Sequence, residues 1–118
     1  MSKHLETGRA GEQQAANWLM QQGFEIVARN YRYQKAEIDL IVRKDCLLVF
    51  VEVKARSGTA YGMPEAAVTS SKSRRIVFAA GQYIQETDWF DEIRFDIISV
   101  IFHPHAAVEI EHIEDAFY

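Results

Sequence analysis

The sequence predicts an α/β protein with a mixed central sheet flanked by helices. Two segments carry apolar residues at helical spacing, and the segments between and after them have the apolar runs or alternation typical of strands. The resulting order is helix, three strands, helix, two strands, which is typical of helices packed on a sheet. The 118 residues contain no repeat, low-complexity tract or Pro/Gly-rich linker, so one domain is expected over residues 1–118.

The chain is expected to begin with a helix and a strand. A helix is predicted over residues 6–22 because four residues share one face of it: Ala15, Trp18, Leu19 and Gln22. Gly23 follows where a glycine commonly ends a helix. Residues 24–33 alternate between apolar and other side chains and are predicted to form a strand.

Residues 36–56 are predicted to form a β-hairpin that turns near residues 43–46. If four residues, 44–47, make the turn, Asp39 lies directly opposite Glu52. A two-residue turn at 44–45 makes the two acids diagonal neighbours on the same face, and a bulge would separate them. Directly opposed side chains begin about 5 Å apart at Cβ.

The rest of the chain is predicted as a loop, a helix and two strands. Residues 57–71 are rich in turn-forming residues. The helix is expected to start near Thr69–Ser71, where hydroxyl groups can cap amides, and to continue along an apolar stripe that includes Ile76 and Tyr83. Residues 93–102 are expected to be a buried strand, and residues 106–113 an edge strand.

Composition excludes several classes of protein. The net charge of −4, from 13 basic and 17 acidic residues, argues mildly against a protein that coats DNA. The longest apolar run, residues 46–51, is far too short to span a membrane, so no membrane partner is expected. Cys46 is the single cysteine, which leaves no internal disulfide and fits a cytoplasmic location.

Asp39, Glu52 and Lys54 interrupt the apolar hairpin. Two neighbouring carboxylates repel each other unless a positive charge lies between them, and a hard divalent cation such as magnesium suits that position. Lys54, two residues after Glu52, lies on the same face and can orient a water molecule or neutralise developing charge. The alternative is a solvated sheet face on which Asp39 and Glu52 pair with Lys54 and Arg56.

The hairpin resembles the D…(D/E)xK metal site of restriction-endonuclease-like nucleases, with EIDLIV, a gap of 12 residues from Asp39 to Glu52, and FVEVKAR. The longer series GRAGEQQAANWL, NYRYQKAEIDLIV, VFVEVKARS, KSRRI and IRFDIISV resembles the bacterial YraN-type family, which is related to Holliday junction resolvases. One departure is Ala36, where that family usually has glycine before the Glu-Ile-Asp segment. We expect a local adjustment there and no lost site.

The resemblance implies a restriction-endonuclease-like fold and a division of roles. Asp39 and Glu52 match the metal-binding acids and Lys54 the catalytic lysine, and the backbone carbonyl of Val53 is implied as a further metal ligand. Glu12 matches a helical acid that some resolvases direct toward the metal. For Glu12 the alternative is an acid that interacts favourably with the dipole in the first turns of its helix.

Five further residues are candidates for binding a nucleic-acid backbone. Three cations open the second helix, where they oppose the helix dipole unless an anion uses them: Lys72, Arg74 and Arg75. Arg56 and Ser57 follow the Lys54 motif and are predicted to help. The alternative for each cation is a solvated basic turn.

Three residues are predicted to support the site without binding the metal directly: Glu37, Arg94 and Asp96. Asp96 interrupts an apolar strand as Asp39 does, and is expected to hold Arg94, Lys54 or Lys72 in place. Glu37 is a candidate acid behind the metal ligands, with a surface ion pair as the alternative.

The expected function is metal-dependent hydrolysis of phosphodiester bonds in DNA, with magnesium as cofactor and manganese as its substitute. The resemblance to resolvases implies a branched or structured substrate. Action on a symmetric junction would need two sites and is compatible with a homodimer. The alternatives are a nucleic-acid-binding protein that kept the fold without turnover and a protein-interaction module.

Overall fold

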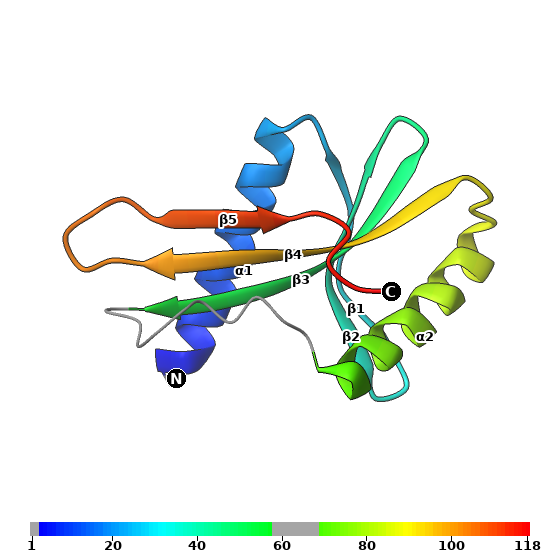
Figure 1. Ribbon diagram of the computed structural model, residues 1–118, viewed down its shortest axis with the longest axis horizontal. Helices are drawn as coiled ribbons and strands as arrows, with labels where there is room; N and C mark the ends of the chain where they lie inside the picture. The colour runs from blue at the N-terminus through cyan, green and yellow to red at the C-terminus, as the bar shows by residue number, and fades with distance from the viewer. Residues whose placement is uncertain (1–2, 58–68) are drawn as a thin grey trace.

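The computed structural model describes residues 3–57 and 69–118, so the loop predicted over residues 57–71 lies mostly outside the described part. The elements follow the predicted order: α1 Lys3–Gln21, β1 Glu25–Tyr33, β2 Ala36–Lys44, β3 Leu47–Ser57, α2 Ser70–Thr87, β4 Glu92–Phe102 and β5 Glu109–Ile113. The predicted α/β class is confirmed (Figure 1). Within the described residues, no helix is both long and apolar enough to cross a membrane.

The five strands form one mixed sheet in the order β1-β2-β3-β4-β5. β3 and β4 are parallel, and the other neighbouring strands are antiparallel. The parallel pair requires a crossover, which contains α2. β5 lies at one edge, as predicted for residues 106–113, and β1 lies at the other (Figure 1).

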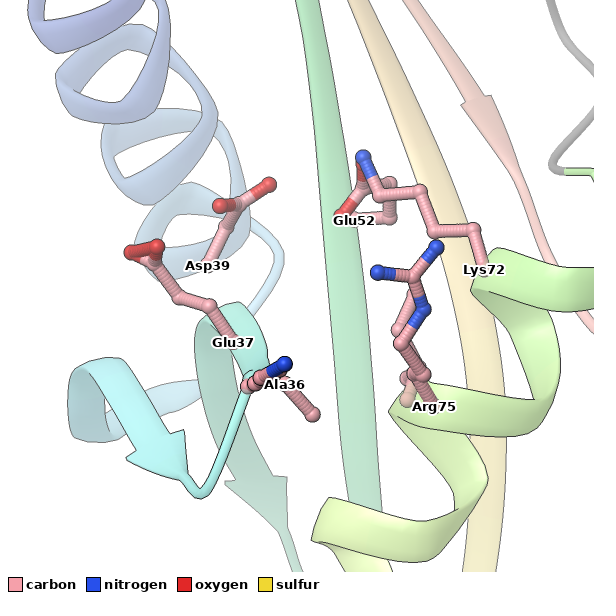
Figure 2. Close-up of a pocket in the computed structure, with 8 residues that line it drawn as sticks. Ala36, Glu37, Asp39, Glu52, Lys72 and Arg75 are labelled. Atoms are coloured by element: carbon pink, nitrogen blue, oxygen red, sulfur yellow. The ribbon is translucent and has the colours of Figure 1, made fainter.

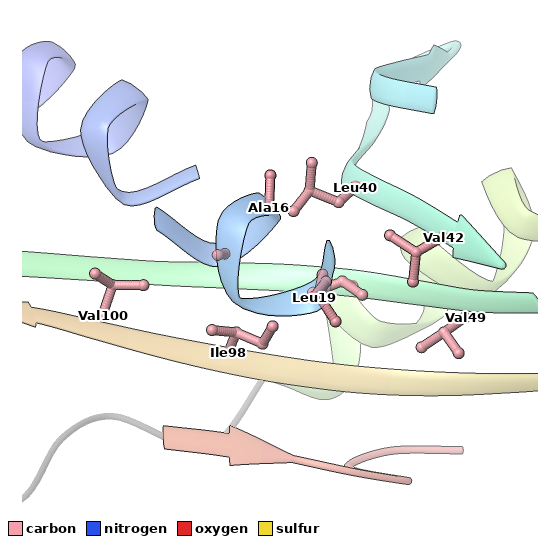
Figure 3. Close-up of a cluster of buried hydrophobic side chains, with 9 residues drawn as sticks. Ala16, Leu19, Leu40, Val42, Val49, Ile98 and Val100 are labelled. Carbon is pink, nitrogen blue, oxygen red and sulfur yellow. The ribbon is translucent and has the colours of Figure 1, made fainter. Parts of the chain in front are cut away.

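Each face of the sheet carries one helix and one apolar cluster. Figure 3 shows the cluster under α1, where Ala16 and Leu19 pack on side chains of β2, β3 and β4. On the other face, α2 contributes Ile76 to a cluster around Phe50. Because side chains alternate along a strand, β3 sends Val49 and Val51 toward α1 and its even-numbered residues toward α2.

Helix α2 begins directly after Thr69, within the predicted capping segment. Thr69 has an extended backbone, and its Oγ1 accepts a hydrogen bond of 3.3 Å from the amide of Lys72. This cap fixes the first turn of α2, and therefore the position of Lys72, against the sheet.

Gly11 allows α1 to approach β3 closely. A Cβ atom at Gly11 would lie 2.3 Å from the Cβ of Ala55, which is too close for either atom. We therefore expect Gly11→Ala to lower the free energy of unfolding by about 1–3 kcal/mol through overpacking. Urea denaturation checks this value.

Two further variants test whether the contact is the cause. Ala55→Gly should rescue Gly11→Ala, because the Ala55 Cα lies at an ordinary 3.6 Å from the added methyl group. Gly8→Ala, in the same helix with nothing within 4 Å, should not destabilise the protein. Equal destabilisation by both alanine variants would contradict the packing explanation.

Candidate functional site

The register of the β2–β3 hairpin brings Asp39 and Glu52 together. Lys44 pairs with Leu47, and the pairing continues to Leu40 and Val51. The turn is therefore the four-residue alternative, and the next position along the register places Asp39 opposite Glu52. The regular pairs end just before the two acids, so their side chains lie where the strands stop pairing.

The alternation of side chains between the two faces of β2 breaks where this pairing ends. Ile38 and Ile41 both pack on the α2 face, whereas Leu40 packs on the α1 face, so strict alternation is interrupted around Asp39. On the neighbouring strand β1, Asn30 has a φ of 50°. The pairs on either side of it are regular, but Asn30 and Asp39 do not pair. Asn adopts this left-handed conformation more readily than most residues.

Asp39 and Glu52 line one pocket of about 220 Å³. We call it the acidic pocket; its charged lining residues are Lys35, Glu37, Asp39, Glu52, Lys72 and Arg75. Figure 2 shows Glu37 and Asp39 on one side of it and Glu52, Lys72 and Arg75 on the other. Asp39 Oδ2 accepts a hydrogen bond of 2.8 Å from the backbone N–H of Val53. Glu52 is 5% exposed and forms an ion pair with Lys72.

The acidic pocket raises the pKa of Asp39 to about 8. Burial is the largest cause, followed by the charge of Glu52, while the hydrogen bond from Val53 acts in the opposite direction and the charge of Glu12 adds to the rise. The Asp39 carboxyl therefore holds a proton at neutral pH unless a cation replaces that proton.

This shifted pKa predicts a pH-dependent stability. The folded protein keeps a proton on Asp39 that the unfolded chain releases above the ordinary pKa of 3.8. The resulting stabilisation is complete below that value and is lost as the pH rises toward about 8, by at most roughly 1.4 kcal/mol per pH unit. Urea denaturation at several pH values should show a shallower decline for Asp39→Asn. Equal slopes for both proteins would contradict the shift.

Glu37, which lines the acidic pocket, and Glu12, which does not, share one partner that the sequence did not indicate. Asn30 Nδ2 lies 3.0 Å from Glu12 Oε1 and 3.4 Å from Glu37 Oε2. Glu37 also pairs with Arg32 at 3.3 Å. The predicted helical acid Glu12 is thus held toward β2 by Asn30. The only signal in the sequence was the tolerance of Asn for positive φ, which does not single out a position.

A second pocket of about 290 Å³ adjoins the first. We call it the basic pocket; its polar and charged lining residues are Glu52, Lys54, Arg56, Lys72 and Ser99. Lys54 therefore lies beside Glu52, as predicted. Among the other candidates, Ser57 ends β3 as an exposed residue and Arg74 is exposed on α2, and neither lines either pocket.

Arg94 and Asp96 are brought together, but on the opposite face of the sheet. Asp96 pairs in register with Val51, which packs in the cluster under α1. It accepts two hydrogen bonds of 2.8 Å from Arg94 and also contacts His112, which the sequence did not single out. Asp96 thus holds Arg94, and the sheet separates it from Lys54 and Lys72.

The residues of the acidic pocket are chemically suited to a hard cation, with one rearrangement. Among the described residues, no group of three or more His, Cys, Asp or Glu side chains is placed to share a metal ion. Glu52 forms an ion pair with the Lys72 ammonium, whereas burial and the charge of Glu52 raise the pKa of Asp39. Asp39 and Glu52 would hold a magnesium ion once Lys72 leaves Glu52, with the Val53 carbonyl as the further ligand that the D…(D/E)xK resemblance implies.

Comparison with known proteins identifies the family of the chain. The model of the uncharacterised protein family UPF0102, the YraN family, matches residues 11–100. A UPF0102 protein of Christiangramia forsetii is 41% identical over 118 residues, which is 100% of this chain and 98% of that protein. One from Rhodococcus opacus is 42% identical over 118 residues, with 99% and 100% covered. One from Geotalea daltonii is 45% identical over 111 residues, with 93% and 87% covered. The chain therefore belongs to the UPF0102 family, to which its sequence motifs pointed.

Proposed function

We propose that the protein hydrolyses phosphodiester bonds in DNA with the help of magnesium, for which manganese can substitute. The observation that carries this proposal is the acidic pocket, which Asp39 and Glu52 line from neighbouring strands just beyond the Leu40–Val51 pair. Burial and the neighbouring Glu52 make a charged Asp39 unfavourable, and a bound cation would relieve this. Lys54 lies beside Glu52 at the neighbouring basic pocket.

The proposed role of each residue follows from its charge. Asp39 and Glu52 would hold the cation, which supplies a water of lowered pKa and stabilises charge on the phosphate. Lys54 would orient the attacking water or neutralise the developing negative charge. Arg56, Lys72 and Arg75 line the two pockets and would bind the backbone phosphates on either side of the scissile bond.

The substrate structure is proposed by analogy with resolvases. A branched or otherwise structured DNA is the substrate class that the motif resemblance implies, and two-fold symmetric cleavage of a junction would need a homodimer. A cytoplasmic location agrees with the single, exposed Cys46.

A cleavage assay tests the proposal. The purified protein is incubated with supercoiled, linear and four-way-junction DNA and with RNA, in magnesium, in manganese and in a chelator. We expect strand cleavage in either metal, none in the chelator, and faster cleavage of the junction than of the linear duplex. Absence of cleavage on every substrate, with the metal bound, would overturn the hydrolytic function.

The Glu52–Lys72 ion pair favours a second function, a nucleic-acid-binding module without turnover. With Lys72 permanently on Glu52, the pocket would not accept a cation, and the remaining cations would still bind phosphates. Calorimetric titration with manganese separates the two functions. This module would bind DNA with the same affinity with and without manganese, whereas the nuclease would bind the metal first.

A further inference from the structure

The ion pair between Glu52 and Lys72 is common to the two adjoining pockets. Both residues line the acidic pocket and both line the basic pocket. Besides this pair, the acidic pocket has the acids Glu37 and Asp39 together with Lys35 and Arg75. The basic pocket has Lys54 and Arg56 and, among the described residues, no second acid. A single lysine therefore contacts the place suited to a cation and also borders the place suited to an anion.

The basic pocket lacks an acceptor for one of its donors. Arg56 Nη2 is buried and has no hydrogen-bond partner among the residues that the structure describes. A buried donor without an acceptor is costly, and a guanidinium group matches the geometry of phosphate oxygens. Ser99, which is 2% exposed and pairs in register with Lys54, provides a hydroxyl group at the same pocket.

Lys72 is able to change partners. Its side chain remains 47% exposed although it is bound to the nearly buried Glu52. Lysine carries a compact charge on a flexible stem, so it can follow a nearby anion without moving the helix backbone. The first turn of α2, to which Lys72 belongs, also favours an anion through its free amides and dipole.

We propose that a backbone phosphate of a nucleic acid binds in the basic pocket to Lys54, Arg56 and Ser99 and draws Lys72 away from Glu52. Glu52 then becomes available to the cation that Asp39 shares. Phosphate and cation binding therefore favour each other, and by linkage the effect is equal in both directions. The inference depends on the proposed cation site but needs no hydrolysis.

Manganese binding, measured by electron paramagnetic resonance of the free ion, tests the coupling without any turnover. Sulfate serves as the oxyanion, with chloride at the same ionic strength as the reference. We expect sulfate to tighten manganese binding to the unaltered protein by about fivefold or more. Lys72→Met should bind manganese about fivefold more tightly without sulfate and should gain little more when sulfate is added.

Variants at two other positions identify the source of the effect. Arg56→Met should bind manganese in chloride as tightly as the unaltered protein does. It should lose the increase in manganese affinity that sulfate causes, because the guanidinium group that donates hydrogen bonds to the anion is absent. Should Arg56→Met fail to fold, Arg56→Lys keeps the charge and is expected to lose most of the gain. Arg43→Met, which removes one positive charge at the far end of the hairpin, should behave like the unaltered protein.

The outcomes separate this inference from the proposed function. Manganese binding that depends on Asp39 but responds neither to Lys72→Met nor to sulfate would overturn the coupling and leave the cation site intact. Absence of manganese binding in every variant would overturn both. A phosphorothioate oligothymidylate, which resists cleavage, should act like sulfate. A gain from sulfate alone would overturn the assignment of the anion to a nucleic-acid backbone.

Discussion

Asp39→Asn is expected to reduce metal-dependent cleavage by at least about a thousandfold while the protein remains folded. The asparagine oxygen can still accept the hydrogen bond from the Val53 N–H, which is 2.8 Å long in the structure. The side chain loses the negative charge that would hold the cation, so the site keeps its shape without its function. Single-turnover cleavage rates with manganese held in excess measure the loss.

The same variant should be more stable than the unaltered protein near pH 8. Asparagine removes a carboxyl group whose burial and whose neighbour Glu52 raise its pKa to about 8. A loss of activity together with a gain in the free energy of unfolding distinguishes a functional acid from a structural one. Lower stability combined with full activity would contradict both the site and the pKa shift.

Two further acids provide matched comparisons for Asp39. Glu52→Gln should lose activity to a similar degree, because Glu52 is the other proposed ligand. Glu37→Gln should lose less than about tenfold, since Glu37 lies at the pocket wall with Asn30 and Arg32 as its partners. Equal losses for all three variants would indicate that the general negative charge of the pocket matters and that the Asp39–Glu52 pair does not.

Asp96→Ala is expected to lower the free energy of unfolding by about 3–5 kcal/mol. Asp96 is 0% exposed and is the shared acceptor of four donors: Arg94 Nε and Nη2, His112 Nε2 at 2.7 Å and the amide of Asp115 at 3.1 Å. His112 Nδ1 in turn accepts a hydrogen bond of 3.2 Å from Trp18 Nε1. The carboxylate therefore links β4, β5, α1 and the C-terminal segment, and its removal leaves several partly buried donors without their shared acceptor.

Urea denaturation measures this effect, and Glu114→Gln is the control. Glu114 lies 3.7 Å from Arg94 but is 63% exposed, so its substitution should change stability by less than about 0.5 kcal/mol. Burial alone would raise the pKa of Asp96, but hydrogen bonds from His112 and Arg94 hold it below its ordinary value. Its contribution is thus present above the ordinary pKa and is lost as the pH falls through the lowered one. A destabilisation below about 1 kcal/mol by Asp96→Ala would contradict this account.

The local elements followed from short-range properties of the sequence. The hydroxyl cap at Thr69, the apolar stripe through Ile76 and the edge strand within residues 106–113 were each predicted from neighbouring residues and are present. The segment that contains residues 58–68 is outside the described part, so its predicted loop remains a prediction.

The sequence by itself determined that Asp39 and Glu52 belong to one hairpin, and strand alternation put them on one face for either turn length in the absence of a bulge. The pairing of Lys44 with Leu47, which only the structure shows, selected the register that brings them opposite each other. The tertiary structure decided which charges surround them. Lys72 binds Glu52 because α2 packs on that face, and Asp96 lies behind the sheet because its parallel register with β3 places it beside Val51. A period of two residues fixes which side chains share a face, but the helix that covers that face is set by packing between segments distant in the chain.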